Sequence, residues 1–271
     1  MVSQRAAAEF SRSAGMMTHR ILILGGTTEA RQLAGRLAVR ADLSLTLSLA
    51  GRTLDPLAQP VPVRSGGFGG AEGLAQYLRD ECIHLLIDAT HPYAANISRN
   101  AAQAATLAGV PILALRRPGW EAVEGDCWKL VENAEEAVAV LGEKPRRVFL
   151  ALGRQEIAAF ERAPQHAYVI RSVDPVEPPL AVPDATYILA RGPFAEADER
   201  ELLSTRRIDA IVAKNSGGAA TYGKIAAARA LGIEVILFRR PDLPHVPHAE
   251  SVAELAGMVD HWLAPAEKRG V

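Results

Sequence analysis

Short apolar runs alternate along the chain with segments whose apolar residues recur at helical spacing. The runs of strand length are ILIL, LSLTLSLA, IHLLIDA, PILAL, RVFLAL, AYVI, TYILA, DAIVA and EVILF. The segment after the first run carries its apolar residues at Ala30, Leu33, Ala34, Leu37 and Ala38, which lie on one face of a helix. Strands that alternate with helices in this way are typical of parallel βαβ units. The pattern therefore predicts an α/β protein with mainly parallel sheets.

Capping residues mark where several helices begin and end. A helix over about 94–108 is expected to start from Thr90 as its N-cap and to end at Gly109. Asn133 and Ser251 are each followed three residues later by a glutamate, as in the capping sequences of helix N-termini. We therefore expect one helix after Asn133 and a last, amphipathic helix after Ser251.

A charged stretch, Lys144–Arg147 (KPRR), interrupts the alternation, and a new strand starts directly after it. We place a domain boundary there, with one domain over 19–144 and another over 145–271. Both halves repeat the order strand, turn, helix, so we expect two Rossmann-like, doubly wound domains with a ligand cleft between them. Residues 1–18 are polar and Ala-rich, which favours a disordered leader.

Composition narrows the function classes. The chain has 271 residues, is 49% hydrophobic and 23% charged, and carries a formal net charge of -1. It has no bilayer-length apolar stretch, no signal-peptide pattern and no Lys/Arg run, so we expect a cytoplasmic protein that binds neither membrane nor nucleic acid. Cys82 and Cys127 lack metal-type spacing and are expected to be free, buried thiols. His245 and His248 lie among prolines without a third ligand nearby, so no metal site is predicted.

Cations follow most of the predicted strands directly. Because ligands bind outside the carboxyl ends of parallel strands, these side chains should gather where a ligand lies. With a net charge close to zero, this is a local concentration of positive charge, and it indicates a bound anion that carries several charges. The cations are Arg52, Arg116, Arg117, Arg154, Arg171, Arg191, Lys214, Arg239 and Arg240.

The turn after the first strand suits a phosphate. Gly25 and Gly26 allow backbone amides to approach an anion, and Thr27, Thr28 and Glu29 open the helix that follows. The turn lacks the complete G-x-G-x-x-G fingerprint, so a plain βα turn is the alternative.

The end of the second strand is the position that meets the ribose in dinucleotide-binding domains. An acidic residue there favours NAD, whereas this chain has Ser48, Gly51, Arg52 and Thr53. An arginine with small hydroxyls suits a 2′-phosphate, which indicates NADP(H) over NAD(H). The alternative for Arg52 is a solvated surface charge. Thr90, at the end of a further strand, completes the set of expected cofactor-binding residues.

Two other strand ends carry residues that could take part in catalysis or bind a ligand. His91 and Tyr93, in the segment DATHPY, could donate a proton or hydrogen-bond a substrate; the alternative is a helix start whose histidine packs against a strand. In the second half, a lysine, two side-chain donors and two glycines at a helix entrance suggest a nest for an anion, and Lys224 extends it. The residues of this predicted nest are Lys214, Asn215, Ser216, Gly217 and Gly218.

Taken in order, these motifs resemble the precorrin-6A reductase family of vitamin B12 biosynthesis. The matching segments are GGTTEA, SLAGRT, GGFGG-x-x-GL, DATHPYA, RRPGW, LGRQE, RSVDP, LARGPF and KNSGGAATYGKIAAAR, over about Ile21–Pro241. DATHPYA and KNSGG are the specific motifs among them. The family also contains a cobalt-precorrin branch, and nothing in the sequence separates a metal-free substrate from a cobalt-loaded one.

The resemblance implies an oxidoreductase that acts on a CH–CH bond: NADPH reduces one macrocycle double bond of precorrin-6A and gives the dihydro product, precorrin-6B. The substrate would be a tetrapyrrole with many carboxylates, which strand-end arginines suit by bidentate pairing. Tyr93, His91 or Lys214 would supply or position the proton. The residues expected to bind substrate are Arg116, Arg154, Arg171, Arg191, Lys214, Asn215, Ser216, Gly217, Gly218 and Lys224.

Two alternatives stay open. One is an NADPH-dependent reductase of another polycarboxylate, and the other is a non-catalytic carrier that shields a tetrapyrrole and hands it on. A carrier would have no use for a phosphate-binding turn paired with Arg52. We expect a monomer, and hand-off of the tetrapyrrole between neighbouring pathway enzymes is compatible with either function.

Overall fold

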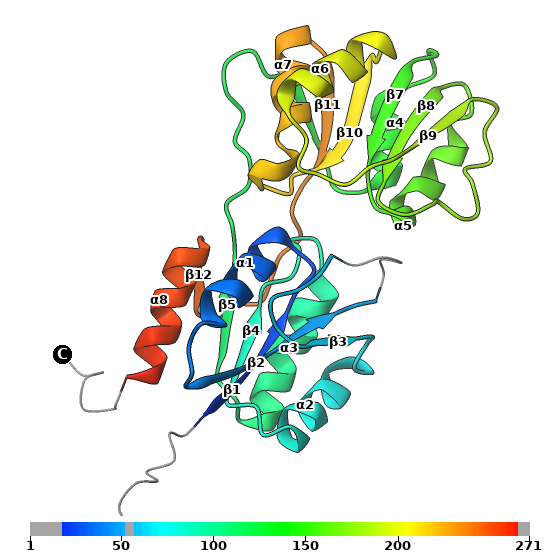
Figure 1. Cartoon of the computed structure of the whole chain (residues 1–271). Helices are drawn as coiled ribbons and strands as arrows, with labels where there is room; N and C mark the ends of the chain where they lie inside the picture. The colour runs from blue at the N-terminus through cyan, green and yellow to red at the C-terminus, as the bar shows by residue number, and fades with distance from the viewer. Residues whose placement is uncertain (1–17, 52–56, 265–271) are drawn as a thin grey trace, which may run out of the picture.

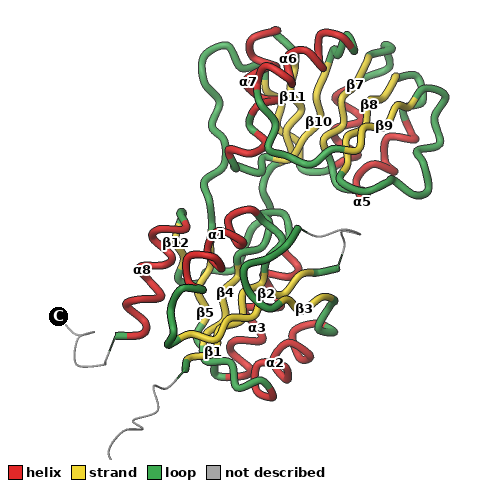
Figure 2. Tube along the Cα trace, in the orientation of Figure 1, coloured by secondary structure: helices red, strands yellow, loops and turns green. Residues whose placement is uncertain are grey.

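The structure, a computed structural model, describes residues 18–51 and 57–264, and in this part the chain forms two six-stranded sheets (Figures 1 and 2). All strand pairs within both sheets are parallel. The predicted fold class, α/β with two Rossmann-like domains, is therefore confirmed.

The first sheet and its helices form the first domain. From edge to edge its strands are β12 (His248–Ala249), β5 (Ile112–Leu115), β4 (Leu85–Asp88), β1 (His19–Leu24), β2 (Leu43–Leu49) and β3 (Val63–Ser65). Helices α1 (Thr28–Leu37) and α8 (Val252–Leu263) share one core with the sheet. Helices α2 (Gly70–Asp80) and α3 (Ala95–Ala108) share another. Successive residues of β1 point to opposite faces of the sheet, so Ile21 lies in one of these cores and Leu22 in the other. This is the pattern of a sheet that is covered on both faces.

The second sheet and its helices form the second domain. Its strands are, in order, β6 (Trp128–Val131), β11 (Glu234–Phe238), β10 (Ala210–Lys214), β7 (Arg147–Ala151), β8 (Ala167–Ser172) and β9 (Ala185–Leu189). Helix α4 (Ala134–Leu141), the short α5 (Arg154–Ile157) and the 3-10 turn η1 (Ala158–Arg162) share one core with it. Helices α6 (Glu196–Thr205) and α7 (Gly223–Leu231) share the other, and the 3-10 turn η2 (Ala219–Thr221) precedes α7.

The sheets divide the chain at other places than the expected boundary at residue 144. Strand β6 precedes that boundary but pairs with β11, and β12 returns from the far end of the chain to pair with β5. The chain therefore passes between the domains twice, through residues 116–127 and 239–247 (Figure 1). The charged KPRR stretch lies inside the second domain, where Arg146 forms an ion pair with Glu234.

All nine expected strands are present, whereas β3, β6 and β12 were not predicted. The three are short edge strands with exposed positions, so they lack the apolar runs that mark central strands. Asn133 and Ser251 cap α4 and α8 as expected.

Two local expectations were wrong. Helix α3 has Ala94 as its N-cap, and the side chain of Thr90 instead donates to the buried carboxylate of Asp88 at 2.6 Å. Cys82 and Cys127 are both exposed, since each lies in a turn just before a strand.

In the described part of the chain, no helix is long and apolar enough to cross a membrane. Nor do the described His, Cys, Asp and Glu side chains gather in groups of three or more that could hold a metal ion.

Candidate functional site

The carboxyl ends of strands in both domains meet at one place. Tyr93 follows β4 in the first domain, and its hydroxyl donates to the backbone carbonyl of Phe238, the last residue of β11. The same hydroxyl accepts a hydrogen bond of 2.8 Å from the backbone N–H of Asn215, directly after β10. The strand ends where α/β proteins bind ligands are therefore joined across the domains.

His91 and Tyr93 lie together, with ring centroids 5.7 Å apart. Burial, reinforced by the nearby charges of Arg117, Lys214 and Arg240, lowers the pKa of His91 to about 3. The imidazole is therefore neutral near pH 7. Its Nδ1 accepts a hydrogen bond of 3.3 Å from the backbone N–H of Tyr93, so the proton resides on Nε2, which can donate to a ligand.

Tyr93 is poorly suited to give up a proton. Burial raises the pKa of its phenol to about 12, against a smaller opposing effect of the hydrogen bond from Asn215. Its hydroxyl proton is also committed to the carbonyl of Phe238. The three residues predicted to be catalytic, His91, Tyr93 and Lys214, are thus brought together.

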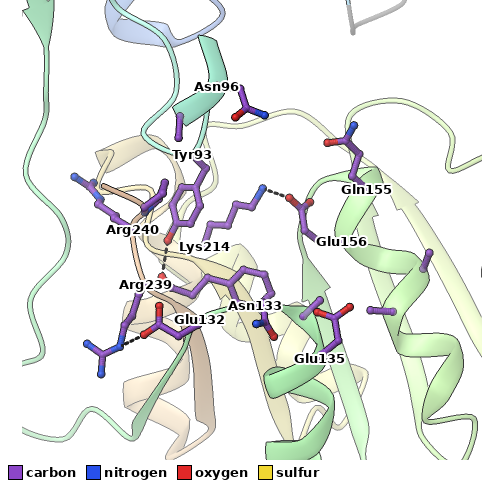
Figure 3. Close-up of a pocket in the computed structure, with 16 residues that line it drawn as sticks. Tyr93, Asn96, Glu132, Asn133, Glu135, Gln155, Glu156, Lys214, Arg239 and Arg240 are labelled. Carbon is purple, nitrogen blue, oxygen red and sulfur yellow. Dashed lines mark hydrogen bonds and ion pairs between the residues drawn. The ribbon is translucent and has the colours of Figure 1, made fainter. Parts of the chain in front are cut away.

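Lys214, the last residue of β10, points into a cavity of about 690 Å³ between the domains (Figure 3). Its Nζ lies 5.2 Å from the centroid of the Tyr93 ring and donates to Oε1 of Glu156 at 2.6 Å. The wall of the cavity also includes Asn96, Glu132, Glu135, Gln155, Arg239 and Arg240. An ammonium group is therefore presented to a space that both domains enclose.

The glycine turn after β1 leads directly into the N-terminus of α1. A Cβ on Gly25 would lie 2.6 Å from Cδ1 of Leu47, so a larger residue there would require the Leu47 side chain to move. Gly26 has φ +111° and open space where a side chain would stand. Thr27 caps α1 by accepting from the N–H of Ala30, and its hydroxyl donates to the carbonyl of Ala89 at 2.9 Å. Thr28, in the first turn of α1, is exposed.

The end of β2 lies beside this turn. The backbone N–H of Gly25 donates to the carbonyl of Ser48 at 2.9 Å, and Ser48 is buried. Gly51 has φ +70° and packs near the backbone of Gly66. Arg52 and Thr53 lie outside the described residues. The carboxylate of Glu29, another of the expected cofactor-binding residues, pairs with Arg117.

Most strand-end cations already have partners inside the protein. Arg240 donates to the backbone carbonyls of Asn215, Arg117 and Pro118. Arg154, the first residue of α5, and Arg191, in the loop after β9, are exposed. Carboxylates of the protein therefore neutralise much of the positive charge that gathers at the strand ends. The ion pairs are Arg116 with Asp88, Arg117 with Glu29, Arg171 with Glu199, Lys214 with Glu156 and Arg239 with Glu132.

Two of these pairs are deeply buried. Arg171 is 8% exposed, makes a bidentate pair with Glu199, and stacks on the ring of Phe194 at 3.7 Å. Asp88 has no exposed surface. Burial alone would raise the pKa of Asp88, but the charge and hydrogen bond of Arg116 outweigh burial and hold it below its ordinary value.

The KNSGG segment forms a junction with the first crossing between the domains. The side-chain amide of Asn215 accepts from the N–H of Trp120 and donates to its carbonyl, at 2.7 and 2.9 Å. The carbonyl of Ser216 accepts from Arg117. Gly217 has φ +72°, and a Cβ there would lie 1.9 Å from the carbonyl oxygen of Pro118. Its glycine is therefore required by close backbone packing.

Gly218 is buried beside the Arg117–Glu29 pair, where a Cβ would lie 3.4 Å from both side chains. Lys224, at the start of α7, is 4% exposed and donates to the carbonyl of Thr221 at 2.7 Å. Burial lowers its pKa to about 7, and the charge of Arg171 adds to the effect. Because the Lys224 side chain is buried in this way, it stabilises the loop that precedes α7.

Two residues escaped the sequence reasoning. Arg64, in the middle of β3, lies over the ring of Phe68 at 3.7 Å and near the hydroxyl of Ser48. The segment VRSGG shows the same strand-then-cation pattern, but its strand was too short to be recognised. Glu156 is the other, and its position three residues after Gly153 in LGRQE carried no signal of its contact with Lys214.

Comparison with known proteins identifies the family. The sequence pattern of the family described as "Precorrin-6x reductase CbiJ/CobK" matches residues 20–260. A precorrin-6A reductase from Sinorhizobium sp is 61% identical over 96% of this chain and 100% of its own length. One from Rhodobacter capsulatus is 48% identical over 93% and 99%. A cobalt-precorrin-6A reductase from Priestia megaterium is 26% identical over 83% and 92%.

A solved structure supports the same assignment. The structure titled "CobK precorrin-6A reductase" superposes with a TM-score of 0.87 at 46% identity, and covers 91% of this chain and 98% of that one. The resemblance of the motifs is thereby confirmed over nearly the whole described chain. The chain belongs to the precorrin-6x reductase family CbiJ/CobK.

Proposed function

We propose that this chain reduces one macrocycle double bond of precorrin-6A in cobalamin biosynthesis, with NADPH as the reductant. Family membership supports reductase activity. The observation that carries the proposal is the hydrogen bonding of Tyr93 to Phe238 and Asn215, which brings the strand ends of both domains together around Lys214. A reductase that binds a cofactor on one domain and a substrate on the other must hold the two molecules close together.

The first domain suits a dinucleotide phosphate. Gly26 leaves open space at the N-terminus of α1, where a side chain would otherwise stand and where backbone N–H groups favour an anion. At the end of β2 the described residues offer a buried hydroxyl, Ser48, with Arg64 beside it. Cation and hydroxyl fit a 2′-phosphate, and Arg52 follows in the sequence. These residues would hold NADPH, which supplies a hydride when bound.

The chain's own residues must supply and place a proton. Reduction of the double bond adds the hydride to one carbon and a proton to its neighbour. Lys214 gives that proton from its ammonium and recovers one from water afterwards. Neutral His91 donates a hydrogen bond from Nε2 and orients the substrate, while Tyr93 fixes the two domains around it.

Substrate carboxylates would be held on the second domain's side of the cavity. The Arg239 side chain is more than half exposed, and Arg154 at the start of α5 and Arg191 after β9 are exposed as well, so these arginines can reach a ligand. The buried Arg171 and Lys224 act as supports instead. This division narrows the substrate-binding set that the sequence predicts.

The test is an anaerobic incubation of the purified protein with precorrin-6A and NADPH, followed by nicotinamide absorbance and product mass. Loss of NADPH with a gain of two hydrogens in the product is the expected result. Tight binding of the tetrapyrrole without NADPH consumption would favour a carrier. Cobalt-loaded precorrin-6A is tested in parallel, because relatives of both kinds match the chain.

A further inference from the structure

Glu156 is the residue to which Lys214 is tied. Its side chain extends from α5, just after β7, and its Oε1 accepts from the Lys214 ammonium at 2.6 Å (Figure 3). The two side chains are 26% and 20% exposed, so the pair is largely shielded and still reaches the cavity. Such partly desolvated, charge-assisted hydrogen bonds are stronger than exposed ones.

The local backbone is shaped to admit this pair. Gly153 has φ −76°, a conformation that any residue adopts, so the backbone does not require glycine there. A Cβ at Gly153 would lie 2.7 Å from Oε2 of Glu156 and 3.7 Å from Nζ of Lys214. The glycine therefore provides the space in which the carboxylate meets the ammonium.

No other described carboxylate of the cavity does this for Lys214. Glu132 pairs with Arg239 at 2.9 Å, and Glu135 makes no ion pair among the described residues. A lysine side chain has about four rotatable bonds, so its ammonium has no fixed position unless another group holds it. The ring of Tyr93 lies on one side of Nζ, and Glu156 provides the directional contact.

We infer that Glu156 is a positioning residue that acts through Lys214, holding the ammonium at the point in the cavity where the substrate receives its proton. The inference rests on the proposed function of Lys214 and deepens it. Glu156 itself touches neither substrate nor cofactor in this role.

The experiment compares Glu156→Gln with Glu143→Gln, a control change that removes the same charge from an exposed position outside the cavity wall. Both are made in the natural chain and in a Lys214→Met background. We expect Glu156→Gln to lower kcat about tenfold or more, with KM for NADPH unchanged. Glu143→Gln should keep kcat within about twofold. Because Glu156 acts through Lys214, adding Glu156→Gln to Lys214→Met should cause no further loss.

A readout without turnover accompanies the kinetics. The rate at which acetic anhydride acylates Lys214, followed by peptide mass spectrometry, should rise several-fold in Glu156→Gln and not in Glu143→Gln. Equal acylation rates in both variants, or equal kcat values, would overturn the inference. A further drop in kcat when Glu156→Gln is added to Lys214→Met would overturn it as well. Failure of the proposed function is seen separately, as natural protein that consumes no NADPH with either substrate.

Discussion

The phenol of Tyr93 donates to the backbone carbonyl of Phe238 across the boundary between the domains. With the hydrogen bond that it accepts from Asn215, this one hydroxyl joins β4 of one sheet to β10 and β11 of the other. A single side chain thus links strand ends of both domains.

Replacement of Tyr93 by phenylalanine should destabilise this junction. The change leaves the carbonyl of Phe238 and the N–H of Asn215 without their partner, so we expect a loss of about 1–3 kcal/mol in the free energy of unfolding. Urea unfolding measures it. Tyr77→Phe is the control, because the Tyr77 hydroxyl makes no hydrogen bond among the described residues, and it should change little. Equal stabilities would show that the hydroxyl does not join the domains.

Arg171 should behave as a structural residue. Arg171→Met leaves Glu199 buried without its cation, which predicts a loss of about 3–5 kcal/mol in the free energy of unfolding. Arg200→Met breaks an exposed pair with Glu196 and should cost less than about 1 kcal/mol. Chemical denaturation of both variants decides the matter. Unchanged stability with a raised KM for the tetrapyrrole would instead support a direct contact with substrate.

Arg52→Ala tests the choice of cofactor. Loss of a charge-assisted contact to a 2′-phosphate should weaken NADPH binding about 10- to 100-fold and leave NADH binding unchanged. Titration of each nucleotide by fluorescence measures both affinities. Arg36→Ala removes an exposed charge in the last turn of α1 and serves as the control. Equal losses for the two nucleotides would refute the 2′-phosphate contact.

The neutral state of His91 predicts a pH dependence. Its pKa is about 3 in the folded protein against an ordinary value of 6.5, so between these values the unfolded chain binds the proton and the folded chain does not. Stability is therefore lost as the pH falls from about 6.5 towards 3, by at most about 1.4 kcal/mol per pH unit. His91→Asn keeps an acceptor for the Tyr93 N–H but cannot titrate. Urea unfolding at pH 7 and pH 5 should show the natural protein losing more stability than this variant; parallel losses would contradict the prediction.

Much of the fold followed from local pattern. Central strands such as β1 and β10 are continuous apolar runs because both faces of their sheets are covered, and such runs are visible in the sequence. The edge strand β12 has two residues, one of them exposed, and only the pairing with β5 makes it a strand. Its place in the first sheet depends on contacts far along the chain, which local pattern does not encode.

The candidate site, like the fold, could be predicted only in part from the sequence. The rule that ligands bind at strand ends found His91, Tyr93 and Lys214, because each follows a recognisable strand. The partners of the cations could not be found, since Tyr93 and Phe238 are 145 positions apart, and Arg171 and Glu199 are 28 apart. A cation after a strand has the same appearance in the sequence whether it awaits a ligand or already binds a carboxylate.

The return of the chain to its first domain bears on the order in which the protein can be completed during synthesis. The second domain ends with β11 at Phe238, whereas the first domain still needs β12 and α8. Leu255 and Val259 of α8 are buried in the core that α1 shares with the first sheet. As the ribosome releases the chain from its N-terminus onward, the domain begun first is finished last, and its apolar face stays uncovered until the final helix emerges.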